Sequence, residues 1–519
     1  MAVAKRIVSF LMVLLLSMNI QAGVFQKVNG RKLFFGGAII SICAIMAYSV
    51  ANAVNSHPSR MRWDWENIEI TPEVLSFNNE KMQDNFLWGV ATSAYQVEGD
   101  DGAKVVPYNQ WQRCEEKEIK IAGENCRPVP HISGKACEHW TRYKEDIQTL
   151  KKLGFNSFRI SISWGKVEPQ EGVFNQNALE HYENVCKEMA QNGIKPVVTL
   201  HHYTHPCWFE DKGGFEKEEN IGHFVCFCEK IFERLKKYVH LWFTFNTFVG
   251  FAMAGYSQGL KPPFKKDMAL AMEVLKNLLE AHVRVYDKFK GIDKNTKVGI
   301  YKNIFHLDSW NMFNPLDLLF SSLGNHISNN LIYNFFKTGV FNIWIPKKVS
   351  MHYENKNAIG ALDFIGLNYY SGAFVRNFKI IPRPECIPTA NARYTIYPEG
   401  FYRALLQVSD KLAKPIQKIK NQTIPIYVTE NGIAALQDSD RDIFYKRYLF
   451  ALSKAMQEGV DVRGYITWSL MDNYEWASGY KIKYGICEVD FDTQERKLKN
   501  GTQFLIDVIN TGNFPRYVL

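Results

Sequence analysis

Polar and charged side chains stand at the ends of several short apolar runs in this sequence. The residues at these ends are Arg159, His202, Asn246, Asn303, Asn368 with Tyr370, Glu430, and Trp468 with Ser469. A carboxylate can act as a nucleophile, and amide, imidazole and hydroxyl groups can hold the hydroxyls of a ligand. An arbitrary set of strand ends would mostly contain turn residues, so the set predicts one polar pocket.

The runs that carry these residues alternate with longer, helix-like stretches from about residue 86 onward. They read FLWGVAT, FNSFRISIS, IKPVVTLHH, HLWFTFN, TKVGIYKN, DFIGLNYY, IPIYVTE and RGYITWS. Between several of them lie amphipathic segments, such as RYKEDIQTLKKLG and NALEHYENVCKEMAQNG, that end in glycine, a usual helix stop. The pattern predicts an α/β chain folded as a single (β/α)8 TIM barrel, in which the ends of the strands meet at one mouth. An open doubly wound sheet is the alternative, but no GxGxxG or P-loop follows any run.

Residues 304–355 lie between the fifth and the sixth predicted strand and are rich in loop-forming residues. We expect extra helices here, at the rim of the barrel.

The first 60 residues differ from the rest of the chain. A short apolar run follows Lys5 and Arg6, and a second run, residues 33–54, has no charged residue for 22 positions. The first has the shape of a signal peptide, and the second is long enough to span a bilayer. We therefore predict a signal-like and membrane-anchor segment over residues 1–60, a linker over 61–82 and the barrel over 83–519. Three topologies fit this pattern: a cleaved signal followed by an anchor, a membrane hairpin, or a single span after an apolar leader. The pattern does not determine the side of the membrane, and export is an alternative to anchoring.

The formal net charge of +9 is spread along the chain in short runs. Without a zinc-finger or RNA-binding signature, this favours a solvated basic surface over nucleic-acid binding. No cofactor signature appears. The HHYTH stretch lacks an HExxH pattern, and alternate residues of a strand face opposite ways, so we expect no metal.

Six stretches resemble glycoside hydrolase family 1, the retaining β-glucosidase family. They are FLWGVATSAYQVEG, KACEHWTRYKEDIQTLKKLGFNSFRISISW, VTLHHYTHP, DFIGLNYYSG, IYVTENGIA and TWSLMDNYEWASGYKIKYGICEVDF, in the order and spacing of the family. The resemblance covers residues 83–515 and implies a single (β/α)8 barrel that acts on a small β-glycoside or oligosaccharide.

The resemblance also implies roles for individual residues. Glu430 is the expected nucleophile, and Arg159 and Tyr370 keep it ionised and aimed. The residues expected to bind the sugar are Gln96, His202, Asn246, Asn368, Trp468, Glu475 and Trp476.

One catalytic position departs from the family pattern. The fourth strand of the family ends in Asn-Glu-Pro, where this chain reads Asn246-Thr247-Phe248. The missing glutamate is the acid/base, which protonates the leaving group and later activates water. A threonine hydroxyl is far too weakly acidic for that role, so the acid step is expected to be impaired or reassigned.

Three functional hypotheses follow from Thr247. The protein hydrolyses substrates whose leaving group needs no proton, as the related plant myrosinases do with thioglucosides. Alternatively, His205, Glu210, Asp211, the substrate or a small acid or base from solution supplies the proton. In the third, the barrel binds glycans without turnover, as the klotho proteins do. The presence of Glu430 favours an enzyme.

Overall fold

The computed structural model describes residues 61–70, 86–99, 108–116, 119–121, 124–126, 129, 131–512 and 517–518. The predicted signal-like and anchor segments lie outside these residues. Within the described part of the chain, no helix has the length and apolar character needed to cross a membrane.

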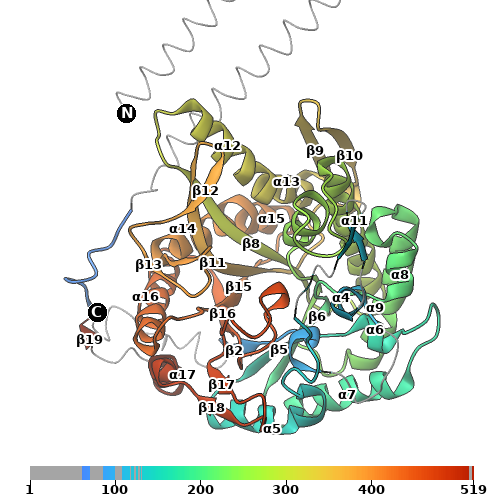
Figure 1. The fold of residues 1–519 in the computed structure, drawn as a ribbon, viewed down its shortest axis with the longest axis horizontal. Helices are drawn as coiled ribbons and strands as arrows, with labels where there is room; N and C mark the ends of the chain where they lie inside the picture. Colours follow the sequence, from blue (N-terminus) through green and yellow to red (C-terminus); the bar gives the residue numbers. More distant parts are fainter. Residues whose placement is uncertain are drawn as a thin grey trace, which may run out of the picture.

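Eight parallel strands form a closed barrel at the centre of the molecule (Figure 1). In chain order they are β2 (Leu87–Ala91), β5 (Ser157–Ser161), β6 (Lys195–His201), β7 (Leu241–Phe245), β8 (Val298–Ser309), β11 (Phe364–Arg376), β15 (Ile426–Asn431) and β16 (Val462–Trp468). Each strand pairs with its neighbours in the chain, β16 pairs with β2, and β8 pairs with β11, which closes the ring. Each overlaps one of the eight predicted runs, so the predicted barrel is confirmed.

Helices surround the strands on the outside (Figure 1). Two of them, α5 (His139–Lys152) and α7 (Gln176–Gln191), coincide with the amphipathic segments expected from the sequence. Each is followed by a glycine with positive φ, Gly154 at 85° and Gly193 at 76°, which is the backbone conformation that ends many helices. The other long helices of the outer layer are α9 (Ile221–Leu235), α11 (Met268–Ile292), α14 (Pro398–Val408) and α16 (Asp438–Gln457).

Alternation along the strands divides the core into two layers. Leu241 and Phe243 of β7 face a cluster inside the barrel, whereas Trp242 packs outward against Phe232 and Phe289 of the helical layer. Because both faces of each strand are buried, the strands are apolar nearly throughout. This is why the sequence shows them so clearly.

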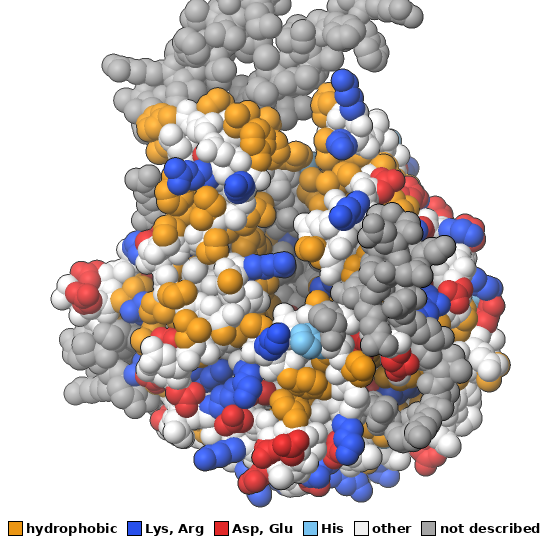
Figure 2. Space-filling model, viewed as in Figure 1, with side chains coloured by type: hydrophobic (Ala, Val, Ile, Leu, Met, Phe, Trp, Pro, Cys, Tyr) orange, Lys and Arg blue, Asp and Glu red, His pale blue; other side chains and the backbone are white. Residues whose placement is uncertain are grey.

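The insertion at residues 304–355 contains helices, as expected, namely α12 (Pro315–Asn325) and α13 (Leu331–Thr338), but also elements that the sequence analysis missed. Strand β8 continues to Ser309, paired with β11, and β9 (Val340–Ile345) and β10 (Val349–Glu354) form a hairpin. Figure 2, drawn from the same side as Figure 1, shows a hollow at the centre of the molecule, with lysine and arginine side chains near its edge.

Candidate active site

Glu430 lies near the carboxyl end of β15 and is held by two donors. The guanidinium of Arg159, from β5, donates to Oε1, and the hydroxyl of Tyr370, from β11, donates to Oε2 at 2.9 Å. Burial, together with the charge of Glu430, raises the pKa of Tyr370 well above its ordinary value, so the phenol keeps its proton and remains a donor. The two contacts fix the direction of the carboxylate, as expected for a nucleophile.

Arg159 is itself held firmly inside the barrel. Its side chain is fully buried, its guanidinium carbon lies 4.1 Å from the centre of the Tyr301 ring, and its Nε donates to the hydroxyl of Thr199 at 3.2 Å. One of its terminal nitrogens also donates to the carbonyl of Thr429 at 3.0 Å. A buried charge requires such partners, because desolvation without them is costly.

Asn246 connects this charged pair to the predicted sugar-binding residues. Its Oδ1 accepts from Arg159 at 2.9 Å and from the amide of Asn368 at 3.1 Å. These two donors fix the orientation of the Asn246 amide, so its Nδ2 donates to Nε2 of His202 at 2.9 Å. Four residues from four strand ends thus form one network, as predicted for a single mouth.

His202 is neutral in this network, and one of its nitrogens has no partner among the described residues. Burial, with the charges of Arg159 and Lys261, lowers the pKa of His202 well below its ordinary value. Since Nε2 accepts from Asn246, the proton is on Nδ1. Nδ1 is buried without a hydrogen-bond partner in the described structure. Buried N–H groups are rarely left unpaired, so this nitrogen indicates a place for an acceptor from a ligand.

The remaining residues expected to bind the sugar lie close to this network; they are Gln96, Glu475, Trp468 and Trp476. The amide nitrogen of Gln96 lies 3.2 Å from Oε2 of Glu475. The rings of Trp468 and Trp476 have their centroids 5.9 and 6.3 Å from that of His202. Burial raises the pKa of Glu475 to about 7, against the attraction of Lys261 and the Gln96 hydrogen bond.

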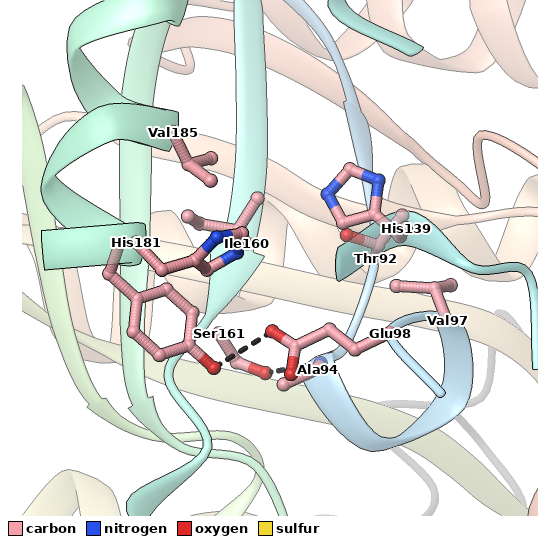
Figure 3. Close-up of a pocket in the computed structure, with 10 residues that line it drawn as sticks. Thr92, Ala94, Val97, Glu98, His139, Ile160, Ser161, His181 and Val185 are labelled. Carbon is pink, nitrogen blue, oxygen red and sulfur yellow. Dashed lines mark hydrogen bonds between the residues drawn. The ribbon is translucent and has the colours of Figure 1, made fainter. Parts of the chain in front are cut away.

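Gln96 belongs to a short helix, α3 (Ala94–Val97), that is anchored from behind (Figure 3). The hydroxyl of Tyr182 donates to Glu98 at 2.8 Å, and the backbone N–H of Ala94 donates to the hydroxyl of Ser161 at 2.8 Å. Lys166 lies 3.1 Å from the other oxygen of Glu98. These contacts hold the chain on both sides of Gln96.

Thr247 follows Asn246 in a strained backbone conformation, with φ at 50°, and immediately precedes α10 (Phe248–Ala252). Its hydroxyl oxygen lies 2.6 Å from the phenol oxygen of Tyr203. Gly250 packs against both hydroxyls. A Cβ added at Gly250 would lie 2.8 Å from the Thr247 oxygen and 2.9 Å from the Tyr203 oxygen. The sequence analysis did not connect Tyr203 with Thr247.

The groups expected as substitute acids are engaged elsewhere. His205 bonds to Glu210 at 2.7 Å, among the rings of Phe209 and Phe251. Asp211 binds Arg113. Among the described residues, no hydrogen bond joins either pair to Thr247 or Glu430. The described residues also contain no group of three or more histidine, cysteine, aspartate or glutamate side chains that could hold a metal ion.

Lys261 is a second residue that the sequence analysis missed. It lies in the loop between residues 257 and 268, with its ammonium nitrogen 3.8 Å from the centre of the Tyr203 ring and 5.2 Å from that of Trp476. Nothing in the local sequence distinguishes it from other loop lysines, because its place over the two rings depends on contacts between distant segments.

Residues 78–514 match the family model described as glycosyl hydrolase family 1. The chain belongs to glycosyl hydrolase family 1. Among family members, beta-glucosidase A of Acetivibrio thermocellus is 31% identical over 458 residues, which are 83% of this chain and 98% of that protein.

Solved structures of family 1 proteins agree with the fold described above. The beta-glycosidase from Pyrococcus horikoshii has a TM-score of 0.72 and 33% identity, covering 84% of this chain and 96% of that one. The beta-glucosidase from Thermotoga maritima in complex with glucoimidazole has a TM-score of 0.71 and 29% identity, covering 83% and 99%. The family 1 assignment from the sequence motifs is therefore confirmed.

Proposed function

We propose that the protein hydrolyses or transfers a β-linked glucosyl or galactosyl unit through an ester on Glu430, with an impaired acid/base step. One observation carries this proposal. Glu430 is held by Arg159 and Tyr370, while position 247 offers only a hydroxyl that is already bonded to Tyr203. These contacts support Glu430 as the nucleophile, and among the described residues no carboxyl group is hydrogen-bonded to Thr247.

In the first step, a carboxylate oxygen of Glu430 forms a bond to the anomeric carbon. The bond from that carbon to the leaving oxygen breaks, and the electron pair stays on that oxygen. Without a proton donor, the leaving group departs as an anion. The rate then depends steeply on the acidity of the leaving group, so donors with acidic leaving groups are favoured.

In the second step, water must attack the ester without a general base. General acid–base help is worth typically about 10²–10⁴-fold in rate, so the glycosyl-enzyme ester is expected to accumulate. Accumulation also favours transfer to acceptors that need no base.

The comparisons support a sugar substrate for this chain. Relatives that match over most of its length are named β-glucosidases, and one solved relative is described with glucoimidazole bound. The unpartnered Nδ1 of His202, next to Asn246, supports a ligand with oxygen acceptors.

The test is covalent labelling with 2,4-dinitrophenyl 2-deoxy-2-fluoro-β-glucoside, followed by mass spectrometry of the peptide that contains Glu430. We expect an adduct on Glu430, no adduct in Glu430→Gln, and little hydrolysis of a natural disaccharide. Absence of labelling, despite measurable binding of a sugar, would favour a catalytically inactive glycan-binding protein.

A further inference from the structure

Lys261 packs against Tyr203, the residue whose hydroxyl lies next to that of Thr247. Its ammonium nitrogen lies over the ring of Tyr203, whose hydroxyl is 2.6 Å from the oxygen of Thr247. Thr247 and Lys261 therefore both contact Tyr203, Thr247 at the hydroxyl and Lys261 at the ring face. Lys261 is partly buried and also lies over Trp476, one of the residues expected to bind the sugar.

In the described part of the chain, the ammonium group of Lys261 contacts only the faces of the Tyr203 and Trp476 rings. No carboxylate lies within 4.0 Å of its ammonium group, and no hydrogen-bond acceptor binds it, although Glu475 and Glu430 are near enough to attract it. Burial lowers the pKa of Lys261 to about 8. A partly buried cation held only by ring faces keeps its N–H donors free, which points to an anion that the site receives.

A second unpaired cation supports the same interpretation. Arg393 is exposed, and its guanidinium forms no ion pair with the described residues. Its charge acts on Lys261 and on Tyr394, whose ring stacks on Tyr370 with centroids 5.6 Å apart. Two positive charges from separate loops therefore repel each other near the residues that hold Glu430.

We infer that Lys261 forms a subsite for an oxyanion at the leaving group, a carboxylate, phosphate or sulfate. This inference rests on the proposed function and specifies its substrate class. For an acyl glucoside, the bond from the anomeric carbon to the acyl oxygen breaks. The acyl oxygen keeps the electron pair and leaves as a carboxylate, while Glu430 forms the ester, so no proton is needed.

The change at position 247 fits an anionic leaving group. A glutamate at this place would repel an anion at short range when ionised, whereas a threonine hydroxyl can donate a hydrogen bond to it. The same subsite would admit an oxyanion as the attacking group in the second step. The hydroxyl at position 247 and the ammonium group of Lys261 thus both favour an anion.

Binding tests the subsite without requiring turnover. We would measure the dissociation constants of benzoate, phenyl phosphate and phenyl sulfate by quenching of tryptophan fluorescence, with neutral benzamide as the reference ligand. Lys261→Met keeps the apolar stem over the rings and is expected to weaken binding of the preferred anion about tenfold, the size expected for a partly exposed charge-assisted contact. Lys261→Arg should retain binding, and Lys266→Met, an exposed lysine of the same loop, should have no effect.

The outcomes separate this inference from the proposed function. Equal binding of the anions to the wild type and to Lys261→Met, or no binding to the wild type, would overturn the subsite even if Glu430 is labelled. An equal loss of affinity for a neutral glucose lactam would also overturn it, because Lys261 would then only support the sugar site through Glu475. Lysine-dependent anion binding without any labelling of Glu430 would leave the subsite standing and reject the glycosidase mechanism.

Discussion

The hydroxyl of Thr247 lies 2.6 Å from the phenol oxygen of Tyr203. The side chain at the position where the sequence motifs lead us to expect the acid/base is therefore bonded to a neighbouring hydroxyl. Burial raises the pKa of Tyr203 above its ordinary value, and the charge of Glu430 adds to this rise. The pair can donate hydrogen bonds to a leaving oxygen, but it is a very poor proton donor.

Restoring the carboxylate should restore the acid step. We expect Thr247→Glu to increase the kcat/KM for an aryl β-glucoside with a weakly acidic phenol by about 10²-fold or more, within the range typical of acid–base catalysis. The rate is measured by release of the phenol. Thr247→Gln has nearly the same shape without a proton to give and should show no gain. An unchanged rate in Thr247→Glu would mean that the pocket has diverged beyond this residue.

Small anions should replace the missing base in the second step. Azide or formate needs no deprotonation before it attacks the ester on Glu430, so we expect either to accelerate steady-state turnover of 2,4-dinitrophenyl β-glucoside about tenfold or more. With azide, the product should be the β-glucosyl azide, which NMR identifies. Acceleration without this product, or an azide of α configuration, would contradict an ester on Glu430.

The hydrogen bond from Tyr370 should contribute to the first step. In Tyr370→Phe the carboxylate of Glu430 loses one of its two donors, and a hydrogen bond to a charged group is worth about 1.5–3 kcal/mol. We therefore expect the rate of labelling by the fluoroglucoside to fall about 10- to 100-fold. Tyr143→Phe, which removes a hydroxyl from the helical layer, is the matched control. Equal effects of the two substitutions would show that Tyr370 acts only through packing.

Sugar binding should depend on pH through Glu475. Burial raises the pKa of this carboxyl to about 7, so it is mostly protonated at pH 5.5 and mostly ionised at pH 7.5. The ionised form accepts hydrogen bonds from sugar hydroxyls at both oxygens, so binding should tighten as the pH rises through this range. We expect an increase of about tenfold in the affinity for a neutral glucose lactam, measured by calorimetry.

Glu475→Gln is the control for this pH dependence. The amide does not titrate, so its affinity for the lactam should be lower at pH 7.5 and nearly constant across the range. If the wild-type profile persists in this variant, another group is responsible for the dependence.

The barrel could be predicted because its strands are buried on both faces and leave continuous apolar runs. The candidate site followed from the polar residues at the ends of those runs, and the structure brings Arg159, Asn246, Tyr370 and Glu430 together. The hairpin of β9 and β10 was missed, since β9 alternates between buried and exposed residues within a stretch that resembles a loop.

The contacts of Thr247 and Lys261 could not be derived from the sequence. Tyr203 lies 44 residues from Thr247 along the chain and follows a different strand. Lys261 reaches Tyr203 and Trp476 only because three separate loops meet over the barrel. Local patterns report burial and secondary structure, but they do not show which loops meet.

The unpartnered nitrogen of His202 also bears on which sugars the protein accepts. Its imidazole N–H is buried and has no acceptor among the described residues, and Asn246 fixes the direction in which it points. Under the proposed function, a sugar that places an oxygen at this nitrogen gains a hydrogen bond, whereas an epimer that directs the oxygen elsewhere does not. The proposal therefore implies that the orientation of one imidazole selects among epimers before any bond to the anomeric carbon changes.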